Sequence, residues 1–268
     1  MKIAKNFIAA LLAGIFFASC EKELDFKYHD IDPILVIEGA LTQDGAEVSL
    51  TLTTPMDEPM NRDRLTDAEV FISDLTTGEE YLLSPDAAGL YVSEHGGITG
   101  HEYRLTVRRE GEVYTSESRM GEPVEITGME FNWIKMPYDY VAVLQVSFTD
   151  DPASFDNCYW MRLYRNGEAY KWAEINDLLS DNGIINEVIM TSRMDLDEED
   201  EKDKLEEGDV VKATVTPVSR EIHDYLEALS VGNSNGPRMF EGGFCLGYFL
   251  AAPVTEKEIA FRPDEISL

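Results

Sequence analysis

The chain has 268 residues, with 52 Asp and Glu against 22 Lys and Arg, and its formal net charge is −30 at pH 7. A field of that sign repels nucleic acid, which excludes nucleic-acid binding as the function. Apolar residues make up 44% of the chain and aromatic residues 10%, so the composition predicts a folded protein with a packed core.

Residues 1–19 have the features of an export signal. Lys2 and Lys5 give a positive start, and residues 7–18 form an apolar run without a charge. A membrane-spanning helix needs about 20 apolar residues, so this run has the length of a signal-peptide core instead. Residues 17–20 read Phe-Ala-Ser-Cys, with small residues directly before the cysteine. We therefore expect cleavage before Cys20 and acylation of its thiol, which would anchor the chain in a membrane by lipid.

Two alternatives to this anchor stay open. The lipobox usually has leucine three residues before the cysteine, and Phe17 stands there. An ordinary secretory signal cut near residues 18–19 would leave Cys20 without lipid, and a retained transmembrane helix is the other alternative. Residues 20–30 are expected to form a lipidated tether. Its acidic cluster at 21–25 resembles the surface-export signal of Bacteroidetes lipoproteins, which implies the outer face of the outer membrane. The alternative is a solvated tether without a signal.

Residues 31–120 are predicted to form an amino-terminal β-sandwich. Apolar runs and apolar–polar alternation indicate short strands, and glycine-containing turns separate them. Close spacing of such strands is typical of a sandwich. The predicted strands lie at 34–37, 48–52, 70–72, 90–92, 103–107 and 113–115.

Residues 121–268 are predicted to form a second β-rich domain with one short helix. Strands are expected at 126–133, 144–148, 159–164, 170–172 and 210–218, with a glycine-rich final strand region at 242–249. Asn166-Gly167 favours a two-residue hairpin turn, because both residues tolerate positive φ angles. Ser219 is the expected cap of the helix, which ends near Gly232. The predicted fold class is therefore mainly β.

The remaining cysteines give no zinc motif. Cys158 and Cys245 lie in apolar, strand-like segments, which predicts buried free thiols. An exported chain meets conditions that permit disulfides, so a bond between the two stays open.

Residues 195–209 form an acidic stretch, the sharpest candidate for a cation site. Calcium binds clustered carboxylate oxygens, but this run lacks the inner glycine and the closing glutamate of an EF-hand loop. A run of like charges is usually a solvated loop, and we predict that here, with calcium left open.

The chain shows no signature of catalysis. The histidines His29, His95, His101 and His223 are scattered, and His95 and His101 are expected to be exposed loop residues rather than a metal pair. No Gly-x-Ser-x-Gly motif of a hydrolase occurs. We predict no catalytic residues, no metal and no cofactor.

Aromatic residues cluster in two places. Trp133, Tyr138 and Tyr140 surround a loop and are the predicted contact surface for a ligand or partner, because exposed aromatic rings anchor such contacts. The second cluster lies in the hairpin at 159–172, where one alternating set is expected to face the core.

The order of several short motifs resembles the domain-of-unknown-function family 4249 of Bacteroidetes outer-membrane lipoproteins, over nearly the whole mature chain. Phe240-Glu241 departs from the Asn-Ile that the family has before its double glycine. The resemblance implies an amino-terminal sandwich of immunoglobulin or transthyretin-like type, genes often beside TonB-dependent transporters, and no known catalytic residues. The motifs lie at 34–39, 68–70, 89–91, 100–105, 218–226 and 242–249.

These observations predict a non-enzymatic lipoprotein, exposed on the cell surface, that assists a TonB-dependent outer-membrane transporter by docking to it or by presenting a ligand. The alternative is a glycan- or matrix-binding adhesion module. An enzyme is a third class, which a pocket holding two carboxylates or a perturbed histidine would favour.

Overall fold

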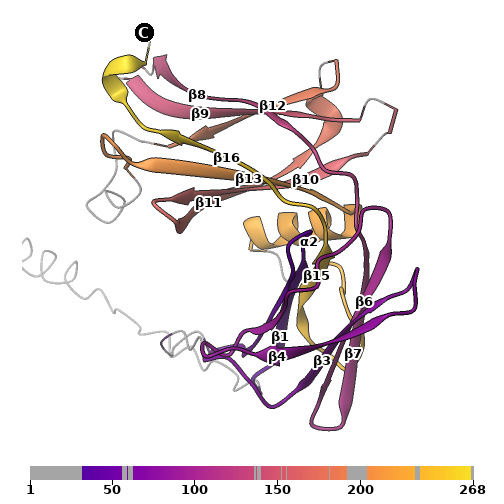
Figure 1. Cartoon of the computed structure of the whole chain (residues 1–268). Coiled ribbons are helices and arrows are strands. Elements are labelled where there is room, and N and C mark those ends of the chain that lie inside the picture. The colour runs from indigo at the N-terminus through magenta and orange to yellow at the C-terminus, as the bar shows by residue number, and fades with distance from the viewer. Residues whose placement is uncertain are drawn as a thin grey trace, which may run out of the picture. The chain divides into compact units, whose positions relative to one another are not determined.

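A computed structural model shows the fold of this chain (Figure 1). It describes residues 32–55, 59, 63–135, 137, 140–151, 153–154, 156–180, 182–191, 204–232 and 236–266. Residues 33–268 form one compact unit. Among the described residues, no helix has both the length and the apolar character needed to cross a membrane.

The largest sheet has nine strands in the order β14-β7-β6-β3-β4-β5-β2-β1-β15. Alternating side chains of its longer strands are buried, as in β1, where every second residue faces the core. Seven of the eight neighbouring pairs of strands are antiparallel, and the last pair, β1 and β15, is parallel. The strands are β1 (Leu35–Leu41), β2 (Ala46–Leu52), β3 (Glu69–Asp74), β4 (Glu80–Pro85), β5 (Tyr91–Ser93), β6 (Glu102–Arg109), β7 (Glu112–Arg119), β14 (Glu241–Gly242) and β15 (Leu246–Ala251).

Two smaller sheets contain the remaining strands. One has the order β12-β9-β8 and the other the order β11-β10-β13-β16. The strands are β8 (Ile126–Lys135), β9 (Tyr140–Thr149), β10 (Cys158–Arg165), β11 (Glu168–Asn176), β12 (Ile184–Met190), β13 (Val210–Val218) and β16 (Thr255–Ala260). The α-helix α2 (Arg220–Ser230) follows β13, and two 3₁₀ turns, η1 (Asp177–Leu179) and η3 (Pro263–Glu265), complete the described elements.

The two groups of strands have separate cores. The first core lies inside the nine-stranded sheet and includes Ile37, Leu105 and Phe249. The second lies between the two smaller sheets and includes Phe148, Met161 and Val215. The described residues are thus mainly β, with several sheets and one α-helix, which confirms the predicted fold class.

A late segment of the chain, β15, returns to the first sheet. Ile37 of β1 pairs with Gly247 of β15, and a side chain at Gly247 would overlap the carbonyl of Ile37. Gly247 also has φ +106°, a backbone region that favours glycine. The predicted division between 31–120 and 121–268 stays a prediction, but the sheet of the first segment contains two strands from the second.

The helix starts where the sequence indicates. The Ser219 side chain accepts a hydrogen bond from the backbone N–H of Ile222, and this caps α2. The spacing of Ile222, Leu226 and Leu229 predicts that they share one buried face of the helix. Ile222 and Leu226 are buried, but Leu229 is exposed, and His223 is buried in addition. The hairpin turn at Asn166-Gly167 is confirmed, with φ +51° and +89°.

Candidate functional site

The predicted lipid anchor lies outside the described residues. The same holds for the tether at 20–30, for His29, for Tyr138 and for residues 195–203 of the acidic stretch. The end of that stretch is packed rather than solvated. Leu205 is buried, and Asp209 is buried in an ion pair with Arg165 at 2.7 Å.

The structure describes two of the three residues of the predicted aromatic contact surface. Trp133 lies on β8, opposite Ala142 of β9, and packs partly buried against the second core. Tyr140 begins β9, and 38% of it is exposed. A contact role for Trp133, Tyr138 and Tyr140 stays a prediction, with Tyr140 the more accessible of the two that the structure describes.

The expectation of free thiols at Cys158 and Cys245 is confirmed. Both cysteines are free and buried. Burial raises the pKa of both thiols, that of Cys245 to about 11. Because the thiolate is the nucleophile, neither cysteine is suited to catalysis at neutral pH.

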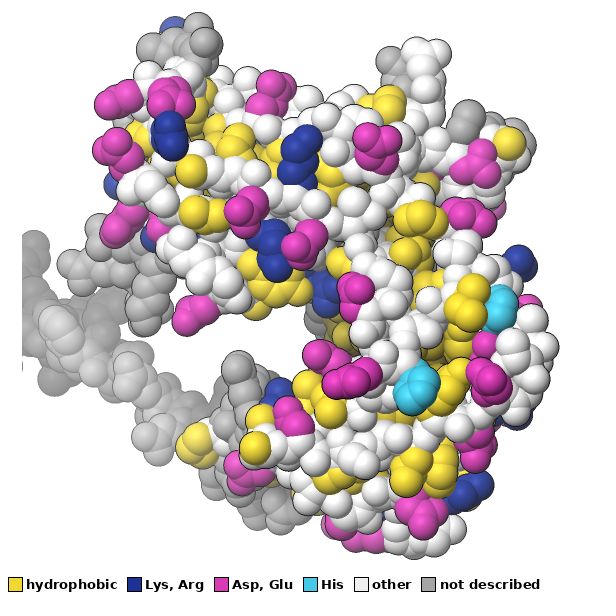
Figure 2. All heavy atoms as spheres, viewed as in Figure 1, with side chains coloured by type: hydrophobic (Ala, Val, Ile, Leu, Met, Phe, Trp, Pro, Cys, Tyr) yellow, Lys and Arg dark blue, Asp and Glu magenta, His cyan; other side chains and the backbone are white. Residues whose placement is uncertain are grey.

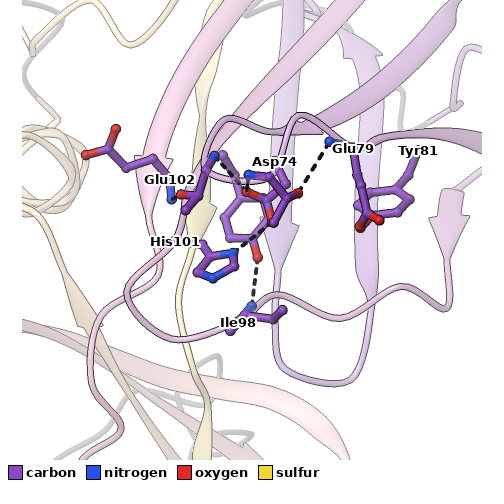
Figure 3. A network of polar contacts seen from close by, with 9 residues as sticks. Asp74, Glu79, Tyr81, Ile98, His101 and Glu102 are labelled. Atoms are coloured by element: carbon purple, nitrogen blue, oxygen red, sulfur yellow. Dashed lines mark hydrogen bonds and ion pairs between the residues drawn. The ribbon is translucent and has the colours of Figure 1, made fainter.

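The two loop histidines have different surroundings. The exposed ring of His95 stacks on Tyr81, with 4.4 Å between the ring centroids. His101 is half-buried, and its Nδ1 lies 2.8 Å from the carboxylate of Asp74 (Figure 3). Asp74 also accepts hydrogen bonds from the backbone N–H groups of Thr76 and Thr77.

This Asp74–His101 network holds a turn together. Burial alone would raise the pKa of Asp74, but the hydrogen bonds from His101, Thr77 and Thr76 outweigh it and hold the pKa below its ordinary value. The backbone N–H of Ile98 donates to the Tyr103 hydroxyl at 2.8 Å. The contacts join the β3–β4 turn to the loop before β6, so we assign the network to stability rather than to chemistry.

One group on α2 has the donors for a metal ion. His223, Asp224 and Glu227 each offer a ligand atom, and these atoms lie within 4.8 Å of one another. Nδ1 of His223 has no hydrogen bond and lies 3.5 Å from the Asp224 carboxylate. Zinc takes such imidazole and carboxylate ligands, although Asp224 and Glu227 are exposed residues whose side chains need no ion.

A carboxylate pair lies between two strand edges. Burial, and then the charge of Glu174 on β11, raises the pKa of Glu187 on β12. Glu174 accepts a hydrogen bond from the Ser230 hydroxyl at 2.9 Å. Neither carboxylate lines the cleft over β6–β7 or the smaller one beside Phe131 and Ile259.

A cleft of about 990 Å³ lies over the β6–β7 hairpin. Leu105, Val107 and Tyr114 of the hairpin face the first core, so the intervening side chains point outward and form the floor. The start of α2 and residues 238–241 form the walls. The floor residues are Arg104, Thr106, Arg108, Val113, Thr115, Glu117 and Arg119.

The cleft reverses the charge balance of the chain. Figure 2 shows acidic side chains spread over the face in view, with fewer basic ones among them. The whole chain has 52 acidic residues and 22 basic ones, whereas four arginines and three glutamates line the cleft. The arginines are Arg104, Arg108, Arg119 and Arg238.

The four arginines differ in how they are held. Arg104 donates to the Glu117 carboxylate at 2.9 Å, and the Arg108 guanidinium lies 5.1 Å from the Phe71 ring centre. Arg238 donates to three backbone carbonyls, those of residues 240, 242 and 243, and so fixes the wall. Arg119 is exposed and has no ion pair or hydrogen bond with the side chains that the structure describes.

No histidine, cysteine or aspartate is among the described residues that line this cleft. Its lining offers guanidinium donors above a polar strand surface. The sequence did not predict this site. The alternation of Arg104, Thr106 and Arg108 was a visible signal, but Arg119 and Arg238 reach the cleft only through the fold.

Comparison with known proteins identifies the family. No curated protein matches the chain. Two solved structures have a low similarity to this chain. A two-domain fibronectin type-III segment of chicken tenascin has 12% identity and a TM-score of 0.24, and the match covers 86% of this chain and all of that one. The FN1–FN3 domains of chicken CNTN1 have 10% identity and a TM-score of 0.24, over 86% of this chain and 65% of that one.

A family model also matches the chain. Residues 21–258 match the family described as a domain of unknown function, DUF4249, as the motif order indicated. The match spans most of the chain and includes the first core, most of the second core and the arginine-lined cleft. The chain therefore belongs to the DUF4249 family.

Proposed function

We propose that this protein is a non-enzymatic docking protein, anchored by lipid at the cell surface, that assists a TonB-dependent outer-membrane transporter. The observation that carries the proposal is where the family match begins. It starts at residue 21, directly after the cysteine that the sequence marks for acylation. The whole matched region would then lie beyond the anchor, free to meet a partner beside the membrane.

The arginine-lined cleft supports recognition rather than catalysis. A binding surface needs positioned donors and room for a partner, and the cleft has both. A hydrolase needs a nucleophile with a base in reach, and the described lining offers no histidine, cysteine or aspartate. The link to a transporter rests on the resemblance of the motifs to lipoproteins encoded beside such transporters.

The adhesion alternative has weaker support. A sugar platform needs flat, coplanar aromatic rings, and the exposed Trp172 meets Trp160 at 84°. The two rings therefore pack edge to face instead of presenting one surface.

Gentle purification of the native complex tests the proposal. We expect the acylated chain in the outer-membrane fraction, and a TonB-dependent transporter that co-purifies with it in mild detergent. A Cys20→Ser variant should lose acyl labelling and membrane attachment. Recovery of the acylated chain without any transporter would overturn the docking function, and unchanged membrane attachment of the Cys20→Ser variant would overturn the anchor.

A further inference from the structure

We propose that the cleft over β6–β7 binds an extended acidic segment of the partner, which adds as a strand to the open edge of β7. This inference rests on the proposed docking function and names its surface. It is carried by three observations: an unpaired stretch of strand edge, the charge of the cleft beside it, and the side chain of Arg119.

The edge of β7 is only partly covered. β14 pairs with β7 at two positions, Glu241 with Thr115 and Gly242 with Tyr114. Residues 116–119 have β6 on one side. On the other side no described strand pairs with their backbone, and the backbone N–H of Ala251 in β15 donates to the Ser118 hydroxyl at 2.9 Å. An unpaired edge presents a row of backbone donors and acceptors that another chain can use.

The direction of the backbone groups favours addition at this place. Gly243 donates to the carbonyl of Val113, and Glu241 pairs with Thr115, so the odd-numbered residues of β7 direct their backbone groups to this edge. Glu117 and Arg119 continue that row beyond the end of β14. Their side chains line the cleft, so an added strand would lie along its wall.

The chain before β14 diverges from β7 instead of closing the edge. Met239 and Phe240 line the cleft, but neither pairs with β7. Arg238 holds this segment by its three bonds to backbone carbonyls. Residues 238–241 thus form a fixed wall of the cleft, and residues 116–119 line the cleft opposite them. The added strand would lie in the cleft between these two segments.

Charge selects an acidic occupant. Four arginines and three glutamates line the cleft, whereas the net charge of the whole chain is −30. The electrostatic repulsion of an acidic segment is therefore weakest at the cleft. Arg119 has no acidic side chain engaged among the described residues, and a guanidinium binds a carboxylate through two parallel hydrogen bonds. In an extended strand, side chains at every second position share a face, so a carboxylate of the added segment can lie on the cleft side and reach Arg119.

Synthetic peptides test the proposal with the soluble Cys20→Ser chain. The probes are an alternating Thr-Glu peptide, the matching Thr-Lys peptide, and a Thr-Glu peptide methylated on the backbone nitrogens of one edge. We expect fluorescence anisotropy to show binding of the first alone. Backbone amide signals of Glu117 and Arg119 should shift on binding in NMR spectra.

Matched variants locate the interaction. Arg119→Glu should weaken binding of the Thr-Glu peptide by at least about tenfold, the equivalent of about 1.4 kcal/mol. Arg262→Glu makes the same change in charge at an exposed residue outside the cleft, where Arg262 pairs with Glu265, and should change binding less than about twofold. Circular dichroism should show that both variants fold.

Four results would overturn the proposal: no binding of the Thr-Glu peptide, equal binding of the Thr-Lys peptide, no effect of Arg119→Glu, or full binding of the methylated peptide. Full binding of the methylated peptide would mean that the cleft recognises the acidic side chains without backbone pairing to β7. If the peptide fails while a transporter still co-purifies with the acylated chain, docking stands and another surface carries it. If neither binds, the docking function itself fails.

Discussion

Replacement of Tyr159 by phenylalanine should cost the second core about 1.5–3 kcal/mol of unfolding free energy. The Tyr159 hydroxyl is buried and donates to the Asp150 carboxylate at 2.6 Å. Asp150 is 8% exposed and also accepts from the Asn157 side-chain amide at 2.9 Å. The substitution leaves the ring in place, so it removes a hydrogen bond to a charged group with almost no change in packing.

The pH dependence of this loss follows from Asp150. Burial alone would raise the pKa of Asp150, but the hydrogen bonds from Tyr159, Ser180 and Asn157 outweigh it and lower the pKa. A lowered carboxyl pKa contributes stability above the ordinary value near 3.8, and that contribution is lost as pH falls through the folded-state value. The difference between Tyr159→Phe and wild type should therefore shrink as the carboxylate becomes protonated.

Urea unfolding of the Cys20→Ser chain, from about pH 7 down to about pH 3, measures this difference. Tyr114→Phe is the control, because Tyr114 lies in the first core and its hydroxyl has no hydrogen bond to the described residues. We expect its loss to stay below about 0.5 kcal/mol. A Tyr159→Phe loss as small as the control, or one that stays constant with pH, would refute the reasoning.

Three further predictions concern stability and reactivity. Gly247→Ala should lower the unfolding free energy by more than about 2 kcal/mol, because φ is +106° and the added carbon meets the β1 backbone; an unchanged urea midpoint would contradict this. A thiol reagent at about pH 8 should label neither Cys158 nor Cys245 in the folded Cys20→Ser chain and both after unfolding, since burial raises both pKa values. Asp74→Asn should lower the unfolding free energy by about 1–3 kcal/mol at neutral pH, measured by urea unfolding. The loss should be smaller in acid, because the lowered pKa of Asp74 contributes stability only while the carboxylate is charged. An equal loss at both pH values would count against the role of His101.

The sequence predicts the longer strands and the helix because their patterns are local. The alternation at 103–107 and 159–164 follows from one buried face, and Ser219 caps α2 through its neighbour Ile222. β12 and β16 escaped prediction. Their exposed residues break the alternation, because each strand lies at the edge of a sheet and buries few side chains.

The candidate site could not be predicted, because it depends on contacts between distant segments. Arg119 and Arg238 are 119 positions apart in sequence, and only the pairing of β14 with β7 brings their segments together. The buried partner of His101 was hidden for the same reason, since Asp74 lies on another strand. The residue types indicated which side chains could bind a ligand, but not which of these side chains would lie close together in the fold.

The parallel pairing of β1 with β15 makes the order of synthesis matter. β1 is the first described strand to be synthesised, yet its parallel partner β15 ends at Ala251. A ribosome that has produced the first seven strands has still left one side of β1 without its neighbour, and closure must wait for almost the complete chain. Pairings over such sequence separations form slowly. A prematurely terminated chain would therefore expose a hydrophobic strand edge, which is the kind of surface that chaperones cover and proteases recognise.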